Sequence, residues 1–131
     1  MADNDVRGQF QHVLSLLDSP YWRDLWDRLH LSVESFETLG LPYNAPDRLV
    51  WQTCQGHDVI LFTGNRNQEG PDSLESALRT LNRPDSLPII TLSNPARLSR
   101  DRTYAHKVAE RLMDYLLDLE NYRGAGRLYV P

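Results

Sequence analysis

The chain has few of the features that mark specialised classes of protein. Cys54 is its only cysteine, which excludes an internal disulfide and any zinc site built from several cysteines. No apolar run approaches the roughly 20 residues that a membrane-spanning helix needs. The 131 residues are 40% apolar and 24% charged, an ordinary composition for a soluble globular protein. We therefore expect a single domain over residues 1–131, with no membrane partner.

The first residues also lack an apolar segment. Residues 1–5 read MADND, which is acidic and cannot serve as a secretory signal, so a cytoplasmic location is expected. In the cytoplasm a single cysteine is usually either a small buried residue or a reactive thiol. We interpret Cys54 as a small buried residue on a helix, because no patterned His and Gly accompany it as they would a reactive thiol.

An excess of positive charge is missing as well. The formal net charge is −4, which argues against a broad nucleic-acid-binding surface. The charge is unevenly distributed along the chain, however. Between positions 97 and 111 there are only two acidic residues, Asp101 and Glu110, and five basic ones: Arg97, Arg100, Arg102, Lys107 and Arg111. This segment is either a solvated helix face with intrachain ion pairs or a strip that binds phosphate.

Helical periodicity is clear in five segments. Apolar residues recur at spacings of three and four, the pattern of a helix with one buried face, over residues 6–17, 21–29, 46–55, 72–81 and 103–121. Pro46 suits the first position of the third helix, and Gly56 suits its end. Asp72 is placed to cap the fourth helix, with Glu75 completing a capping box.

Short apolar or alternating runs predict the strands. Residues 31–36 alternate as L-S-V-E-S-F, while residues 58–62 and 89–92 are continuous apolar runs typical of buried parallel strands. Residues 127–130 form a last strand, and Met1 with Ala2 is the stub of a first one. The alternation of strands and helices predicts an α/β fold, a three-layer sandwich with a mostly parallel central sheet of about four to five strands.

Ligands of such sheets bind outside the carboxyl ends of the strands. Several polar residues follow predicted strands and should meet at that edge: Asp3, Asp5, Asn65, Asn67, Glu69, Ser93 and Asn94. Asp47, which opens a helix, can point toward the same edge. Their convergence predicts a polar site there.

The order of these motifs resembles a known superfamily. A strand ending in "ADNDV", a helix, an alternating strand, the run "APDRLVWQTCQGHDVILFTGNRN", a helix and two further strand–helix steps are similar to the PIN-like nucleases. More narrowly, the chain resembles small PIN-like proteins related to the toxin components of bacterial toxin–antitoxin systems. The resemblance covers nearly the whole chain, and it rests on the order of elements and on short motifs.

The resemblance implies a set of metal ligands. In PIN-like nucleases three or four carboxylates hold one or two Mg²⁺ or Mn²⁺ ions for phosphodiester hydrolysis. The matching positions are Asp3, with Asp5 as the near alternative, Asp47, Asn65 and Asn67. Asn65 and Asn67 are amides where carboxylates are expected, and amides are weaker ligands for hard cations. The resemblance also implies that the first strand lies at the centre of the sheet, although only two residues precede Asp3.

Two other acids could supply the missing charge. Asp72, at the start of the fourth helix, or Glu69 could swing into the vacated position, and Arg66 could position a phosphate. Each residue also has an ordinary structural explanation. Asp72 can be only a helix cap, Asp47 a favourable anion in a first helical turn, and the amides turn formers.

The resemblance predicts a metal-dependent ribonuclease with a degenerate acidic site, in which Asp3, Asp47 and Asn65 are catalytic, Arg66 and Asn67 bind substrate, and Asp72 completes the metal ligands. The alternative is a non-catalytic PIN-like module that binds a partner. RNA or a protein antitoxin is the implied partner. A homodimer is also expected because Trp22 and Trp26 lie on amphipathic helices, although both could simply complete the core.

Overall fold

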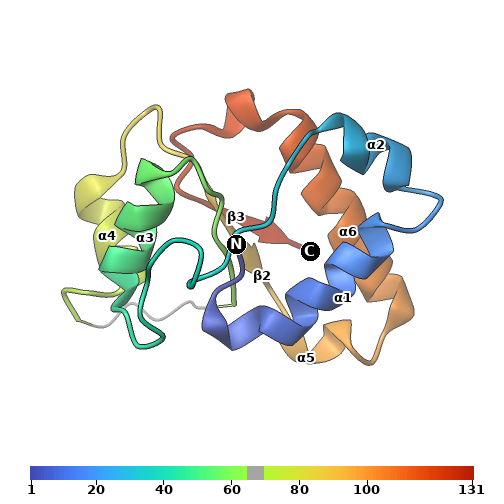
Figure 1. Ribbon diagram of the computed structural model, residues 1–131, viewed down its shortest axis with the longest axis horizontal. Coiled ribbons are helices and arrows are strands. Elements are labelled where there is room, and N and C mark those ends of the chain that lie inside the picture. Colours follow the sequence, from blue (N-terminus) through green and yellow to red (C-terminus); the bar gives the residue numbers. More distant parts are fainter. Residues whose placement is uncertain (65–69) are drawn as a thin grey trace.

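The computed structural model describes residues 1–64 and 70–131. It is a mixed α/β fold with a three-stranded sheet in the order β1 (Phe62–Thr63), β2 (Ile89–Leu92) and β3 (Arg127–Val130) (Figure 1). Both strand pairs are parallel, with Phe62 beside Ile90 and Ile90 beside Leu128. The predicted parallel α/β class is confirmed, while the described residues form three strands where four to five were expected.

The predicted first strand is present as a single bridge. Ala2 pairs in parallel with Phe62. The Phe62 amide donates to the Met1 carbonyl and the Asp3 amide donates to the Phe62 carbonyl, both at 2.8 Å. Because the other side of β1 pairs with β2, this stub lies outside β1 and not at the centre of the described sheet. A central two-residue strand is therefore not required, and Asp3 still ends beside the carboxyl end of β1.

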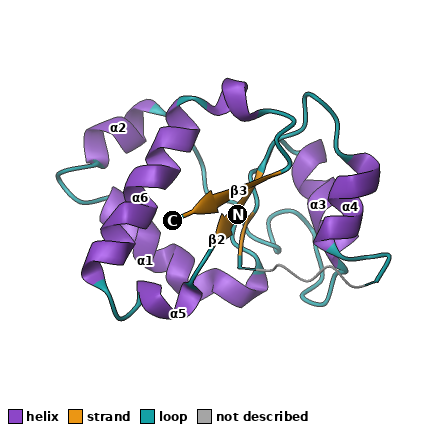
Figure 2. Ribbon diagram, turned by 180° about the vertical axis from the view of Figure 1, so that it is seen from behind, coloured by secondary structure: helices purple, strands orange, loops and turns teal. Residues whose placement is uncertain are grey.

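Helices cover both faces of the sheet (Figure 2). On one face, α1 (Arg7–Leu17) and α6 (Arg102–Leu117) pack with α2 (Arg23–Arg28) and the short α5 (Pro95–Leu98). On the other face lie α3 (Asp47–Gly56) and α4 (Leu74–Leu81). Alternate strand residues point to opposite faces. Accordingly, Phe62 and Ile90 join the first core, and Leu61 and Ile89 join the second.

The aromatic residues that suggested a dimer contribute to the first core. Trp22 is 9% exposed and belongs to that cluster, and Trp26 is partly buried against it. Both therefore supply the apolar area that a small domain needs.

Four predicted helices have boundaries close to those observed. α1, α2 and α3 begin or end within two residues of the predicted positions, and Pro46 precedes α3 as its cap in an extended conformation. The predicted cap of α4 is wrong. Ser73 caps it, accepting a 3.1 Å hydrogen bond from the Ser76 amide, whereas the Asp72 carbonyl accepts from the Arg48 amide. Asp72 is thus tied to the start of α3.

Three other elements differ from prediction. Residues 31–36 form no strand. An alternating strand would bury positions 31, 33 and 35 together, but Leu31 and Val33 are exposed and the buried residue is Phe36. Residues 58–61 are outside β1, and Asp58 has a left-handed backbone (φ 55°) that does not fit a strand. The last long helix ends at Leu117, followed by a 3₁₀ turn, η2 (Leu119–Tyr122).

Cys54 is buried on α3, as predicted. Burial raises the pKa of its thiol to about 11, so the thiolate is scarce at neutral pH. Among the described helices, none is both long and apolar enough to cross a membrane.

Candidate acidic site

Asp3 and Asp5 meet at the carboxyl end of β1. A short 3₁₀ turn, η1 (Asn4–Val6), separates Asp3 from α1, and the Asp3 carboxylate caps it by accepting from the Asn4 amide at 2.8 Å. The fully buried Thr63 hydroxyl lies 3.0 Å from Asp3 Oδ2 and 3.5 Å from Asp5 Oδ1. The Thr63 hydroxyl has one proton and can donate it to only one of the two carboxylates at a time. It therefore cannot offset the negative charge of both.

Burial and repulsion by neighbouring carboxylates raise the pKa of both carboxyl groups. For Asp3, desolvation is the main cause, and the charges of Asp5 and Asp47 add to it against hydrogen bonds from Asn4 and Thr63. For Asp5, which is the more exposed of the two, desolvation again leads, the Gly64 amide hydrogen bond opposes it, and the Asp47 charge adds to it. Such a cluster favours protons or a cation.

The raised pKa of Asp3 predicts a specific pH dependence of stability. A carboxyl group whose pKa is raised above its ordinary 3.8 binds its proton more tightly in the folded state, so its contribution to stability is lost as pH rises through the folded pKa. Asp3→Asn keeps the capping oxygen and removes the charge. We expect this variant to melt at a higher temperature than the wild type at pH 7, with the difference shrinking toward pH 3.8. A lower melting temperature at pH 7 would contradict this electrostatic account.

Gly64 allows the acidic pair to approach the sheet. A Cβ at this position would lie 3.0 Å from Val6 Cγ1 and 3.1 Å from both Asp5 Oδ2 and Pro95 Cγ. These contacts are tighter than most side-chain packing, so an added side chain would require small shifts of its neighbours, the Asp5 carboxylate among them. The glycine that follows β1 therefore has a steric role in shaping the site.

Gly64→Ala is expected to destabilise the protein by about 1 kcal/mol through this crowding. Gly8→Ala is the matched control, because a Cβ at Gly8 on α1 meets nothing within 4 Å. Gly8→Ala should be neutral or slightly stabilising, since alanine has the higher helix propensity. Urea unfolding of both variants measures the difference, and equal stabilities would show that the Gly64 contacts relax without cost.

Asp47 lies near the pair as the first residue of α3. Its charge raises the pKa of Asp3 and of Asp5, which places the three carboxylates within electrostatic reach. The three carboxylates do not form one metal-binding cluster: within residues 1–64 and 70–131, no three His, Cys, Asp or Glu side chains are arranged to hold one metal ion. Asp72 is exposed and joins the neighbourhood through its backbone hydrogen bond to Arg48.

A second polar group lies across the sheet from the acidic pair. Thr63 and Thr91 are register partners on β1 and β2, and both are fully buried. Arg127 Nη1 donates to Thr91 Oγ1 at 2.6 Å, and Arg127 Nη2 lies 2.6 Å from Glu75 Oε1 on α4. The acidic site thus borders a buried Arg–Glu pair, which the sequence patterns did not indicate.

Asn94, after β2, and several arginines of the basic segment have local partners. The Asn94 side chain caps α5 by accepting from the Arg97 amide at 3.2 Å. Arg97 pairs with Asp101 at 2.9 Å, and Arg111 lies 4.5 Å from the Tyr115 ring. These contacts agree with the expectation of a solvated helix face with intrachain pairs.

The remaining predicted site residues fall outside the part of the chain that the structure describes. These are Asn65, Arg66, Asn67 and Glu69. Their proposed roles in metal and phosphate binding stay predictions. The residue patterns do not single out Thr63 and Gly64, although a Thr-Gly that directly follows an apolar run is the available signal for a polar strand end.

The chain matches no protein-family model, no curated protein and no solved structure. The resemblance to PIN-like nucleases accordingly stays a prediction.

Proposed function

We propose that this protein is a metal-dependent ribonuclease of the PIN-like type with a reduced acidic site. The supporting observation is the pair Asp3 and Asp5, which converge on the Thr63 hydroxyl at the carboxyl end of a parallel strand. This is the edge at which open α/β sheets bind their ligands. The nearby charge of Asp47 adds to the negative potential.

The residues present fit a loosely held Mg²⁺ or Mn²⁺ ion. Mg²⁺ keeps several waters and is commonly bound by one or two carboxylates together with substrate phosphates. Asp3 and Asp5 would supply the two carboxylates. A bound metal ion would polarise a phosphoryl oxygen and lower the pKa of a bound water.

The chain's own residues would prepare this site. The Thr63 hydroxyl and the Asn4 amide hold the Asp3 carboxylate in one orientation. Asp47 would help to hold the cation or orient a water through its charge. Asn65, Arg66, Asn67 and Asp72 would complete the pocket and position the phosphate, as the resemblance implies.

The rival proposal is a non-catalytic PIN-like module that binds a partner at the same edge. It is favoured by two observations: the described residues contain no ready group of three metal ligands, and the two central positions of the predicted motif are amides. Such a module would use Asp3 and Asp5 to attract a cationic group of its partner and would not cleave RNA.

Calorimetry and a cleavage assay separate the two proposals. The nuclease should bind Mn²⁺ or Mg²⁺ at millimolar levels or below and cleave single-stranded RNA only when the metal is present. Asp47→Ala should abolish cleavage, whereas the matched control Asp27→Ala, an exposed carboxylate on α2, should not. Absence of metal binding at millimolar concentration would rule out the nuclease and leave the binding module.

A further inference from the structure

An exposed tyrosine stands next to the acidic site. Tyr43 is 74% exposed in the turn that leads into α3, where the Ala45 amide donates to the Pro42 carbonyl at 3.0 Å. The Asn4 side chain donates to the Tyr43 carbonyl at 2.8 Å. Because Asn4 lies between Asp3 and Asp5, this hydrogen bond fixes the position of the Tyr43 backbone relative to both carboxylates.

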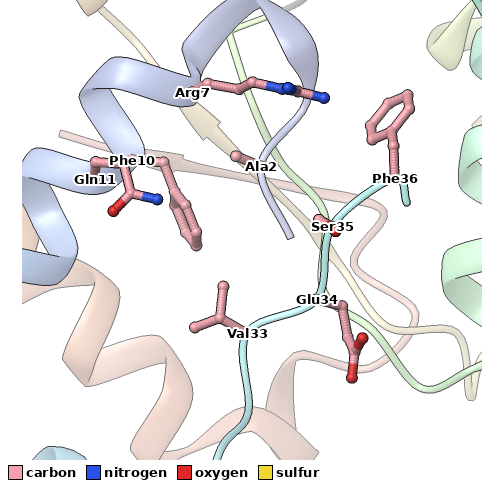
Figure 3. A pocket seen from close by; sticks show the side chains of 8 residues that line it. All are labelled: Ala2, Arg7, Phe10, Gln11, Val33, Glu34, Ser35 and Phe36. Atoms are coloured by element: carbon pink, nitrogen blue, oxygen red, sulfur yellow. The ribbon is translucent and has the colours of Figure 1, made fainter. Parts of the chain in front are cut away.

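A cation is held against the same ring. The Arg7 guanidinium lies 5.8 Å from the centre of the Tyr43 ring and 5.8 Å from that of Phe36. Figure 3 shows the Arg7 side chain extending from the start of α1 toward Phe36, which is 2% exposed and therefore fixed in the core. Arg7 makes no ion pair with any carboxylate in residues 1–64 and 70–131, so its charge is not cancelled by a close anionic partner there.

The exposed Tyr43 ring is available to a ligand. A mostly solvent-exposed aromatic ring contributes little apolar burial to the fold. The combination of an aromatic face and an adjacent arginine matches the chemistry of a single-stranded nucleic acid, whose bases stack on aromatic rings and whose phosphates attract arginine. A base inside a duplex is already stacked and cannot use the ring in this way.

We propose that Tyr43 is a stacking platform for one unpaired base of a single-stranded RNA, and that Arg7 contacts a phosphate beside that base. The inference rests on the proposed function, and it adds to it a binding position for one base beside the acidic pair. Asn4 is a positioning residue, since it acts on the base through the Tyr43 backbone.

Binding to a fluorescein-labelled, unstructured oligoribonucleotide of about ten nucleotides tests the platform. Fluorescence anisotropy without divalent metal, which prevents cleavage of the probe, should show the dissociation constant rising about 5- to 100-fold for Tyr43→Ala, the range expected for one lost base stack. Tyr43→Phe keeps the ring and should bind like the wild type. Arg7→Ala should weaken binding and reduce the salt dependence by about one phosphate contact.

The control is Tyr21→Ala. Tyr21 is 81% exposed and lies two residues before α2, which is at the opposite end of the molecule from α3 (Figure 1). Its removal should leave the dissociation constant unchanged. A scan with single abasic nucleotides adds a readout that a structural role would not move: one abasic position should weaken wild-type binding and have no effect on Tyr43→Ala.

The outcomes distinguish this inference from the proposed function. If the protein cleaves RNA in a metal-dependent way but Tyr43→Ala binds and cleaves like the wild type, the platform is overturned and the nuclease stands. If the protein binds RNA with the expected Tyr43 and abasic-site effects but never cleaves it, the platform stands and the nuclease is overturned. Failure of the wild type to bind RNA overturns the platform directly.

Discussion

Gly124→Ala is expected to lower the free energy of unfolding by about 3 kcal/mol, the sum of a left-handed backbone cost and severe crowding. Gly124 has φ +84°, and a Cβ there would lie 2.8 Å from the Pro84 carbonyl oxygen and 3.0 Å from Pro84 Cα. Both contacts are with backbone, so no side-chain rotation can relieve them. The Gly124 amide also donates to the Ser86 carbonyl at 2.9 Å, which ties this turn to the loop before β2.

Gly40→Ala is the matched control for this effect. Gly40 has a similar φ of +70°, but a Cβ there would meet nothing within 4 Å. It should therefore lose only the backbone part, about 1 kcal/mol. Urea unfolding of both variants, with unchanged slopes against urea concentration, isolates the steric part. Equal losses would show that the chain around Pro84 moves aside, contrary to the close packing of the Gly124 turn.

Glu75→Ala is expected to lower the free energy of unfolding by roughly 2 to 3 kcal/mol, somewhat less than a fully buried ion pair would lose. Arg127 is only 7% exposed, while the Glu75 side chain is 25% exposed and lies 2.6 Å from its guanidinium. Glu75→Ala removes the carboxylate that lies beside the buried Arg127 guanidinium. Because Arg127 starts β3 and also bonds to Thr91, we expect the sheet next to the acidic site to loosen.

Two controls separate charge from general truncation. Glu75→Gln keeps an oxygen for the guanidinium and should lose less stability than Glu75→Ala. Glu120→Ala removes the partner of Arg123 from an exposed pair at 2.8 Å, in which water screens the charges, and should leave the unfolding midpoint nearly unchanged. Hydrogen exchange at β3 amides would report the loosening. If Glu75→Ala and Glu120→Ala unfold alike, the buried pair does not stabilise the fold.

Local periodicity accounted for much of the fold. The helix patterns anticipated α1, α3 and α6, and the runs at residues 89–92 and 127–130 coincide with β2 and β3. The failures have local causes of their own. Phe36 breaks the alternation of the segment before it. At the start of α4, Asp72 and its neighbour Ser73 both have side chains suited to capping, and Ser73 is the observed cap.

The candidate site was predictable only in part. Because parallel strands end at one edge, the sequence placed Asp3 and Asp5 beside the strand that became β1, as the structure also does. It did not indicate Tyr43, since an exposed aromatic in a turn has no periodic pattern. Nor did it indicate the Glu75–Arg127 pair, because Glu75 also suited a capping box.

The sequence by itself determined the described α-helices other than α5, two of the three described strands and the α/β class, because those depend on contacts between residues a few positions apart. The tertiary structure decided which distant side chains meet: Thr63 with Asp3 across 60 positions, Arg127 with Glu75 across 52, and Asn4 with Tyr43 across 39. Such pairs depend on strand register and on the packing of helices against both faces of the sheet. Neither quantity is encoded in the spacing of neighbouring residues.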